Sequence, residues 1–239
     1  MNTLRRNTLV VGASGDIGLE ITKHLMKEGD NLYLHYFQNK PQLDMDKDGE
    51  QSIVLLKADL SNNDGLETLL EQLPKEIDRV IFANGKSFIG LFQEMSHHQM
   101  DAMIHLHVHA VWKISKHVIP YMIHKKNGQL ILVTSIWGEV GASCEVAYSS
   151  VKGSQELFVK SLAKELGPSG IRVNAVAPGY IETKMNHHLS QEEKEVLVQE
   201  IPLQGPGLTE DIAHSVMFLL SEKARYITGE SIRVNGGWS

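Results

Sequence analysis

A tyrosine and a lysine four residues apart, Tyr148 and Lys152, are the side chains of this sequence best suited to chemistry. On a helix, this spacing places both residues on one face. Ser135 lies thirteen residues before Tyr148, at the end of an apolar run. The phenol of tyrosine has an ordinary pKa of about 10, and a neighbouring ammonium is expected to lower that pKa. The three residues therefore predict proton transfer to or from the oxygen of a carbonyl or an alcohol.

A glycine-rich segment near the start of the chain predicts a nucleotide-binding loop. The sequence VGASGDIG at 11–18 follows an apolar run and precedes a helical pattern that ends at Gly29. Glycines let the backbone approach a pyrophosphate, and the start of the helix supplies N–H groups and a positive dipole end. The strand pattern before the loop and the helical pattern after it distinguish the segment from an ordinary tight turn.

Runs typical of strands alternate with runs typical of helices along the whole chain. The predicted strands are 8–11, 31–36, 53–57, 79–83, 129–134, 171–176 and 231–234. The predicted helices are 17–28, 64–73, 99–124, 146–166, 191–200 and 209–221. This alternation predicts an α/β fold of the Rossmann type, a doubly wound, seven-stranded parallel sheet with helices on both faces.

We expect a single dinucleotide-binding catalytic domain over residues 1–239. The polar stretch 39–51 predicts a loop with a short helix. The segment 183–207 follows Pro178 and Gly179, where a strand ends, and the carboxyl ends of strands face the ligand crevice in such folds. This segment is expected to form a lid over the substrate; a merely structural helical hairpin is the alternative.

Composition excludes several classes of protein. The formal net charge of −6 gives no basic excess of the kind that nucleic-acid binding needs. The sequence has no apolar run long enough to span a bilayer and no secretory signal pattern. Cys144 is the only cysteine, which excludes an internal disulfide and fits a reducing cytoplasm. We expect a cytoplasmic protein with Cys144 as a small buried residue.

The twelve histidines do not predict a metal site. His105 and His109 have the spacing of a helical metal pair, and His97-His98 and His187-His188 are adjacent pairs. No carboxylate or cysteine completes a recognisable zinc pattern, so solvated or packed histidines are expected and no metal is predicted.

These and further motifs resemble the short-chain dehydrogenase/reductase family from residue 8 to residue 238. The matching segments are VGASGDIG, ADLS at 58–61, FANG at 82–85, the set of Ser135, Tyr148 and Lys152, RVNAVAPGYIET at 172–183, and ITGESIRVNGG at 227–237. Within the family, the chain is similar to bacterial 3-oxoacyl-acyl-carrier-protein reductases. The segment 135–155 resembles a subgroup of Gram-positive bacteria that includes reductases of the 5-aminopentanone modification on elongation factor P.

The resemblance implies a role for each matching residue. Tyr148 is similar to the catalytic acid/base, Lys152 would lower its pKa and hold the nicotinamide ribose, and Ser135 would bind the substrate oxygen. The resemblance also implies contacts with each part of the cofactor. Gly12, Ser14, Asp16, Ile17 and Gly18 would lie at the pyrophosphate, His35 and Tyr36 beside the adenosine ribose, and Asp59 and Leu60 at the adenine. Ala83, Asn84 and Gly85 would line a ribose, and Pro178, Gly179, Ile181 and Thr183 would hold the nicotinamide and the diphosphate.

Three positions depart from the family pattern. His107 stands where an asparagine usually helps a water-borne proton relay to the lysine. Either histidine preserves that relay in altered form, or it only packs the helix. Asp16 replaces a glycine and suits a helix start, and its side chain is expected to point to solvent, away from the pyrophosphate. Asn84 is shifted from the family asparagine, so only the backbone role of Ala83 and Asn84 is expected to remain.

The end of the second predicted strand bears on the choice of dinucleotide. Residues 35–40 read HYFQNK, without the carboxylate that binds the ribose 2′-hydroxyl of NAD. NADPH is therefore expected and NADH disfavoured. Gly15 stands where many NADPH-dependent relatives carry an arginine, so the expected preference is modest.

The resemblance predicts a cytoplasmic NADPH-dependent carbonyl reductase that converts a 3-oxoacyl thioester on acyl carrier protein to the 3-hydroxyacyl form, as in fatty acid biosynthesis. One alternative is a reductase of the 5-aminopentanone modification on elongation factor P. A second, of another class, is a non-catalytic nucleotide-binding sensor. The helices at 99–124 and 148–166 imply a homotetramer. Lys126 matches one basic position that docks acyl carrier protein, whereas Ser169 replaces the other.

Overall fold

The computed structural model describes residues 5–43, 51–186 and 189–238 and contains one parallel sheet of seven strands. The strand order is β3-β2-β1-β4-β5-β6-β7, and every neighbouring pair is parallel. The strands are β1 (Asn7–Val11), β2 (Asn31–Tyr36), β3 (Ile53–Lys57), β4 (Arg79–Phe82), β5 (Gly128–Val133), β6 (Ile171–Pro178) and β7 (Ser231–Val234). This arrangement confirms the predicted Rossmann-type fold.

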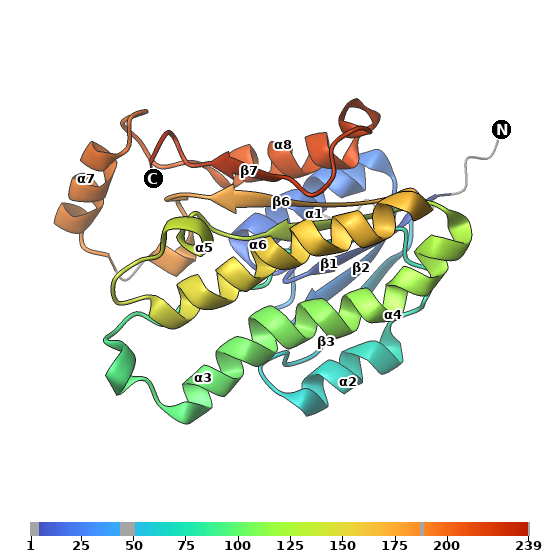
Figure 1. Cartoon of the computed structure of the whole chain (residues 1–239), viewed down its shortest axis with the longest axis horizontal. Helices are drawn as coiled ribbons and strands as arrows, with labels where there is room; N and C mark the ends of the chain where they lie inside the picture. Colours follow the sequence, from blue (N-terminus) through green and yellow to red (C-terminus); the bar gives the residue numbers. More distant parts are fainter. Residues whose placement is uncertain (1–4, 44–50, 187–188, 239) are drawn as a thin grey trace.

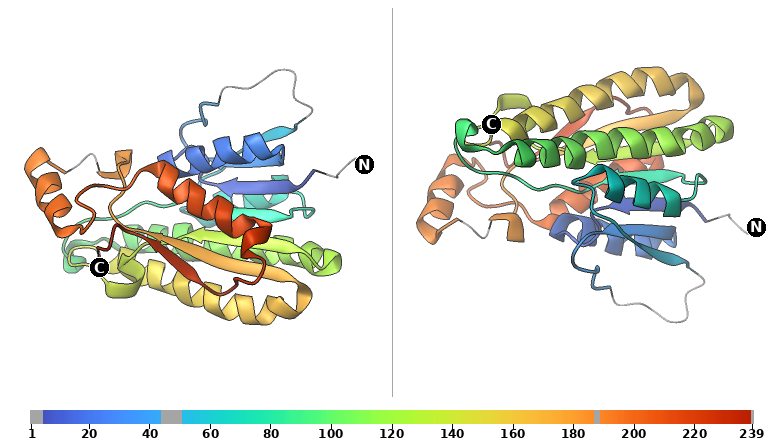
Figure 2. Two further views of the ribbon diagram at one scale, coloured as in Figure 1. Left: turned by 90° about the horizontal axis from the view of Figure 1, so that it is seen from above. Right: turned by 90° about the horizontal axis from the view of Figure 1, so that it is seen from below.

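Helices cover both faces of the sheet (Figures 1 and 2). They are α1 (Asp16–Glu28), α2 (Asn63–Gln72), α3 (His97–Ile104), α4 (Ala110–Lys125), α5 (Trp137–Val140), α6 (Val146–Leu166), α7 (Gln191–Glu200) and α8 (Thr209–Leu220). Side chains of α1 and α8 pack on one face of the sheet, and those of α2, α4 and α6 pack on the other. The chain therefore has the three layers that a doubly wound sheet requires.

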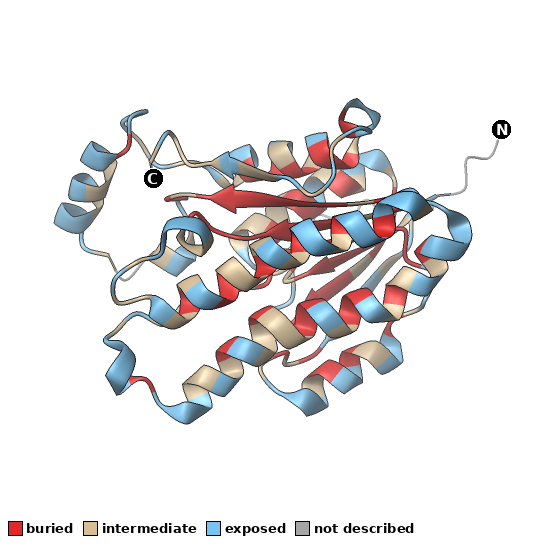
Figure 3. Ribbon diagram, viewed as in Figure 1, coloured by how far each residue is buried: buried red, intermediate tan, exposed pale blue. Residues whose placement is uncertain are grey.

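Burial explains why the central strands are apolar along their whole length. Every residue of β4 is buried, as are all residues of β6 except Arg172. A sheet with helices on both faces buries both sides of each strand, and the ribbon of β6 is accordingly mostly red in Figure 3. The edge strand β3 differs, because Val54 and Leu55 are exposed.

The carboxyl ends of the strands form the functional edge of the sheet. The arrow of β6 points toward the side of the molecule that carries α5 and α7 (Figure 1). The strand order reverses between β1 and β4, which are neighbours in the sheet. In open α/β sheets, ligands bind outside the carboxyl ends at such a reversal. The glycine loop after β1 lies there.

Three predictions about elements need correction or comment. The helix predicted over 99–124 is present, but it contains an unpredicted π-helical turn at His105–His109 between α3 and α4. The short helix α5 was not predicted. Of the stretch 39–51, residues 44–50 lie outside the described part of the chain. None of the described helices is both long and apolar enough to cross a membrane.

Candidate active site

Ser135, Tyr148 and Lys152 meet at the functional edge. Ser135 follows the end of β5, and Tyr148 and Lys152 lie one turn apart on the inner face of α6. All three are buried, with Tyr148 9% and Lys152 2% exposed. The side chain of Ser135 lies close enough to the phenol of Tyr148 to act on its pKa, and its Oγ accepts from the backbone N–H of Trp137 (3.2 Å). The sequence therefore selected three side chains that the fold brings together, although their catalytic role stays a prediction.

Tight packing of α5 against α6 fixes this arrangement. A Cβ atom on Gly138 would lie 2.7 Å from the backbone carbon of Lys152, so no larger residue fits there. Backbone hydrogen bonds attach the turn after β5 to β6: the N–H of Thr134 donates to Val176 (2.8 Å) and that of Ile136 to Pro178 (3.1 Å). The serine is consequently held on rigid elements.

The acidity of Tyr148 differs from the expectation. Burial raises its pKa above the ordinary value, the nearby Glu145 raises the pKa further, and the side chain of Ser135 opposes both. The net shift is upward, and a lowering of this pKa by Lys152 stays a prediction. The phenol is removed from water, and desolvation disfavours its charged form.

The ammonium of Lys152 is hydrogen-bonded to a strand and to its own helix. Its Nζ donates to the backbone oxygen of Val133 (2.9 Å) and to Oε1 of Gln155 (3.2 Å), and it lies 5.7 Å from the centre of the Tyr148 ring. Burial lowers the pKa of Lys152 to about 7, against the opposing effect of Glu156. An ammonium has three N–H donors, so one remains available for a further acceptor.

His107 lies in the π-helical turn and is fully buried. Its ring meets that of Tyr148 edge to face, with centres 5.7 Å apart, and its Nε2 lies 3.0 Å from the backbone oxygen of Lys86. Burial, and next the charge of Lys152, lowers the pKa of His107 to about 3. The ring is therefore neutral at physiological pH, which favours the packing alternative over a protonated relay.

Gln155 is a site residue that the sequence reasoning missed. It is buried, its Nε2 donates to the backbone oxygen of His107 (2.7 Å), and its Oε1 accepts from Lys152 (3.2 Å). The amide thus joins the lysine to the backbone of the π-helical turn. A polar residue three positions after Lys152, on the inner face of the same helix, was the available signal.

The glycine loop has the shape of an anion cradle. Gly12 has φ +84°, and a Cβ atom there would lie 2.7 Å from the Cα of Asn84. Gly15 caps α1 without a side-chain acceptor, so the first N–H groups of the helix are left for an outside acceptor. The loop of Gly12, Ser14, Asp16, Ile17 and Gly18 therefore fits a pyrophosphate.

Asp16 does not point to solvent as predicted. Its Oδ2 accepts from the backbone N–H of Lys184 (2.7 Å), and its Oδ1 lies 3.6 Å from the ammonium of the same residue. The carboxylate thus turns from the loop toward segment 183–207, because that segment supplies two donors. This contact couples the first turn of α1 to the start of the candidate lid.

His35 supports the loop from behind. Its Nδ1 accepts from the backbone N–H of Gly12 (3.1 Å), and its Nε2 lies 3.1 Å from the backbone oxygen of Ala58. Burial lowers the pKa of His35 to about 4. Both ring nitrogens are used within the protein, so His35 would act on a dinucleotide only through Gly12. Tyr36 is also buried, whereas residues 37–40 are exposed.

The residues predicted to lie at the adenine and the ribose differ in whether their polar side-chain atoms already have hydrogen-bond partners. The carboxylate of Asp59 already accepts from Ser61 (2.7 Å to its Oγ) and from Asn62 (3.1 Å). The side chain of Leu60 is in the core, which leaves only its backbone. Nδ2 of Asn84 donates to the backbone oxygen of Leu106 (2.8 Å). Its buried Oδ1 has no partner within the described structure.

Ala83 and Gly85 lie on either side of Asn84. The N–H of Ala83 donates to Val11 (2.9 Å), which joins this segment to the end of β1. A Cβ atom on Gly85 would lie 3.4 Å from the ring of His107. The three residues therefore connect the glycine loop to the π-helical turn.

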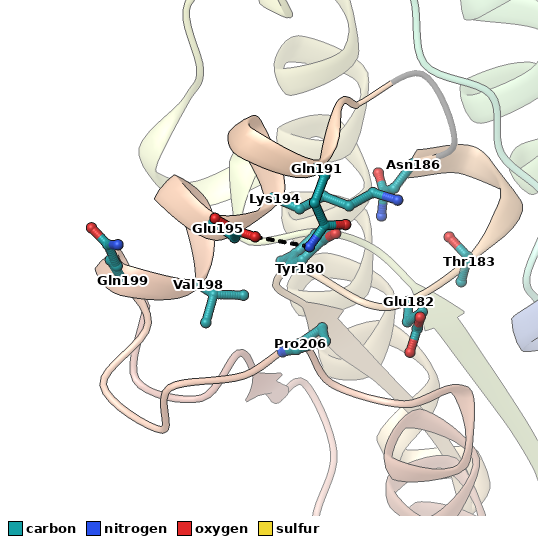
Figure 4. Close-up of a pocket in the computed structure, with 10 residues that line it drawn as sticks. All are labelled: Tyr180, Glu182, Thr183, Asn186, Gln191, Lys194, Glu195, Val198, Gln199 and Pro206. Atoms are coloured by element: carbon teal, nitrogen blue, oxygen red, sulfur yellow. Dashed lines mark hydrogen bonds between the residues drawn. The ribbon is translucent and has the colours of Figure 1, made fainter.

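A pocket of about 460 Å³ lies beyond the end of β6 (Figure 4). Backbone hydrogen bonds of Gly207 with Tyr180 and Glu182 close the base of segment 183–207. Gly179, whose N–H donates to Val234 (3.0 Å), and buried Ile181 precede it. The lining residues are Tyr180, Glu182, Thr183, Asn186, Gln191, Lys194, Glu195, Val198, Gln199 and Pro206. Helix α7 and the end of β6 thus form facing walls.

The expectation that Cys144 is buried is wrong, whereas the docking role of Lys126 stays a prediction. Cys144 is only partly buried and has φ +62°, because it lies in the turn before α6. Lys126 lies at the amino end of β5, a strand of six residues, which is about 20 Å long and ends next to Ser135. A Cβ atom on Gly170 would lie 2.6 Å from the backbone oxygen of Lys126. The two candidate docking positions 126 and 169 are therefore close together but remote from Ser135 of the same chain.

Comparison with known proteins finds similarity over nearly the whole chain. Residues 12–239 match a family model described as enoyl-(acyl carrier protein) reductase. An uncharacterized oxidoreductase of Bacillus subtilis is 43% identical over 240 residues, which cover 98% of this chain and 99% of the relative. A 3-oxoacyl-[acyl-carrier-protein] reductase of Staphylococcus epidermidis is 32% identical over 242 residues, covering 98% and 99%. A solved 4-hydroxyisoleucine dehydrogenase complexed with NADH has a TM-score of 0.91 at 25% identity, covering 98% and 99%.

Proposed function

The chain belongs to the short-chain dehydrogenase/reductase family of NAD(P)-dependent oxidoreductases, and we propose that it is an NADPH-dependent carbonyl reductase. The observation that carries the proposal is that the fold buries Ser135, Tyr148 and Lys152 together at the carboxyl ends of the strands. A phenol with a raised pKa is protonated at neutral pH and can donate its proton. This protonation state suits the reduction of a ketone.

The residues divide the work of the reaction. A dinucleotide held by these residues would supply the hydride. Ser135 holds the substrate oxygen beside Tyr148, and Tyr148 donates a proton to that oxygen. Lys152, with a pKa lowered to about 7, uses its remaining N–H donor to hold the nicotinamide ribose. The loop of Gly12 to Gly18 would hold the pyrophosphate. Asp59 would bind the adenine, and residues 178–183 would bind the nicotinamide.

The preference for NADPH rests on the residues after β2. Residues 37–40 are exposed and contain Lys40 but no carboxylate, so nothing there repels a 2′-phosphate. The related 4-hydroxyisoleucine dehydrogenase was solved with NADH, which makes the preference worth measuring. We expect a higher kcat/KM with NADPH than with NADH. A strong preference for NADH would contradict the proposal.

The first candidate substrate is a 3-oxoacyl thioester on acyl carrier protein. The 32% identity to a 3-oxoacyl-[acyl-carrier-protein] reductase over the whole chain supports it. Lys126 could dock the carrier only on a neighbouring subunit, because it is remote from Ser135 of its own chain. Fatty acid biosynthesis is the corresponding place in metabolism.

A second candidate substrate is the 5-aminopentanone group on elongation factor P. The pocket contains two carboxylates, Glu182 and Glu195, but a single cation, Lys194. Ser135, Tyr148 and Lys152 do not line this pocket, so its charge balance supports an amine-bearing ketone through contacts at the lid and not at the reacting oxygen.

The two substrates are distinguished by rates of NADPH oxidation. Acetoacetyl acyl carrier protein and ketone-modified elongation factor P are compared with the wild type and with Glu195→Gln. If the aminoketone is the substrate, Glu195→Gln lowers its kcat/KM several-fold and leaves the thioester rate unchanged. A faster thioester rate that is insensitive to Glu195→Gln would support the first candidate.

We further propose one catalytic domain, with segment 183–207 as its lid and a homotetramer as its assembly. The described strands all belong to one sheet, and α7 in that segment forms a wall of the pocket. Exposed apolar side chains on α4 and α6, such as Trp112 and Leu157, support subunit contacts. Cytoplasmic location is proposed from the single cysteine.

A further inference from the structure

Two helices that are far apart in the sequence carry the same Glu-x-x-x-His pattern. Helix α1 contains Glu20 and His24, and α8 contains Glu210 and His214. In each pair, the histidine Nε2 lies 3.7 Å from a carboxylate oxygen of its glutamate. The His24 and His214 rings meet edge to face, with their centres 5.2 Å apart. The two pairs therefore adjoin across the helix–helix contact.

The scaffold beneath these side chains is fixed by hydrophobic packing. Both helices cover the same face of the sheet (Figure 2). Ile21 and Leu25 of α1 share a buried cluster with Ile212 and Val216 of α8. Each helix returns the chain between parallel strands, so the two helices run in the same direction and their Glu-x-x-x-His pairs are in register. Sites on rigid elements hold ligands better than sites on loops.

The donor set matches a transition-metal ion. His24, Glu210 and His214 each offer one ligand atom, and these atoms lie within 4.8 Å of one another; no other group of three was found in the described part of the chain. Tetrahedral zinc requires ligand atoms about 3.3 Å apart. Glu210 and His214 are largely exposed, so their side chains can rotate to close that difference. Imidazole ligands favour zinc over magnesium or calcium.

We propose that His24, His214 and Glu210 form a binding site for a divalent transition-metal ion, represented by Zn²⁺, that fastens α1 to α8. Glu20 either becomes the fourth ligand or orients His24, although Lys23 already pairs with its second oxygen (2.8 Å). The site would join the helix that follows the dinucleotide loop to the helix that follows segment 183–207. It is independent of the proposed reaction, which uses no metal.

Zinc titration of the metal-free protein against a chromophoric chelator tests the site. The variants are His24→Asn and His214→Asn, and the matched control is the double variant His105→Asn/His109→Asn, which removes another adjacent histidine pair. We expect one tightly bound zinc per chain in wild type and control, and an affinity at least about tenfold lower in each site variant. A zinc concentration about 100-fold above Kd should raise the Tm of the wild type by roughly 5–10 °C. The same zinc concentration should raise the Tm of His214→Asn far less.

The proposal is overturned if the wild type binds no zinc at micromolar concentration, or if the site variants bind it as tightly as the wild type. It is also overturned if zinc affinity decreases only in the control variant His105→Asn/His109→Asn. His214 is 61% exposed, so its substitution should not disturb folding. His214→Asn alone decides the question if His24→Asn does not fold.

Discussion

At the scale of single residues, burial sets the proton chemistry of the site more strongly than charge does. It raises the pKa of Tyr148, lowers that of Lys152 to about 7, and lowers that of His107 to about 3. Each shift disfavours the charged form of its group. The phenol of Tyr148 is thereby kept protonated, as a proton donor must be, and the imidazole of His107 packed beside it is kept neutral.

The neutral His107 predicts a pH dependence of stability. Its folded pKa of about 3 lies below its ordinary value of 6.5. Between these values, the unfolded chain binds a proton that the folded protein does not bind, so the free energy of unfolding decreases as the pH falls through this window. His107→Asn removes this effect and makes the decrease shallower by up to about 1.4 kcal/mol per pH unit. Urea unfolding at several pH values measures it; equal slopes would show that His107 is not held neutral.

Gln155 is expected to control the protonation of Lys152. Gln155→Leu removes the acceptor at 3.2 Å from the lysine Nζ and leaves the His107 carbonyl without its amide donor. The ammonium form loses a hydrogen bond, so the pKa of Lys152 falls further and kcat decreases roughly tenfold. A pH–rate profile measures both changes. Gln72→Leu on the exposed side of α2 is the control, and an unchanged profile for Gln155→Leu would exclude this positioning role.

At the scale of elements, the loop between β1 and α1 requires the backbone of Gly12 to lie close to Asn84. Gly12→Ala places a Cβ 2.7 Å from the Asn84 Cα at φ +84°, and this strain should lower the free energy of unfolding by about 2–4 kcal/mol and weaken NADPH binding. Gly15→Ala is the matched control, because Gly15 has φ −73° and its Cβ would lie 3.5 Å from Gly12. Denaturation and NADPH titration compare them; two equally stable variants would refute the constraint.

The sequence predicts elements well where a single pattern decides them. Strands buried on both faces, such as β4 and β6, are continuous apolar runs, and Gly29 marks the end of α1. The π-helical turn at His105–His109 has no such signal, because it depends on how His107 packs beside Tyr148 and Lys86. Likewise, the pairing of His24 with His214 arises only when α1 and α8 pack together.

The site was predictable as a set of residues but not as a set of interactions. Spacing identified Ser135, Tyr148 and Lys152. It did not reveal that Lys152 donates to Val133 and Gln155, since these contacts depend on the neighbouring strand. The acceptor role of Asp16 toward Lys184 was hidden for the same reason.

At the scale of the whole molecule, the exposed apolar residues of α4 and α6 predict assembly. Leu157 is 67% and Trp112 51% exposed, and a second subunit that covered them would remove this apolar surface from water. Leu157→Glu should therefore reduce the mass measured by light scattering, without unfolding the chain. Val196→Glu, at a position 57% exposed on α7, is the control and should leave the mass unchanged. A monomeric wild type would contradict the proposed tetramer.

The most direct test of the reductase assignment is the turnover of Tyr148→Phe, with Tyr226→Phe, at a position 97% exposed, as its control. Removing the phenol oxygen takes away the proton donor, so kcat for ketone reduction should fall by about 10²–10⁴-fold. The Kd for NADPH, measured by fluorescence titration, should stay nearly unchanged. A Tyr148→Phe protein that still reduces the ketone at close to the wild-type rate would contradict the account.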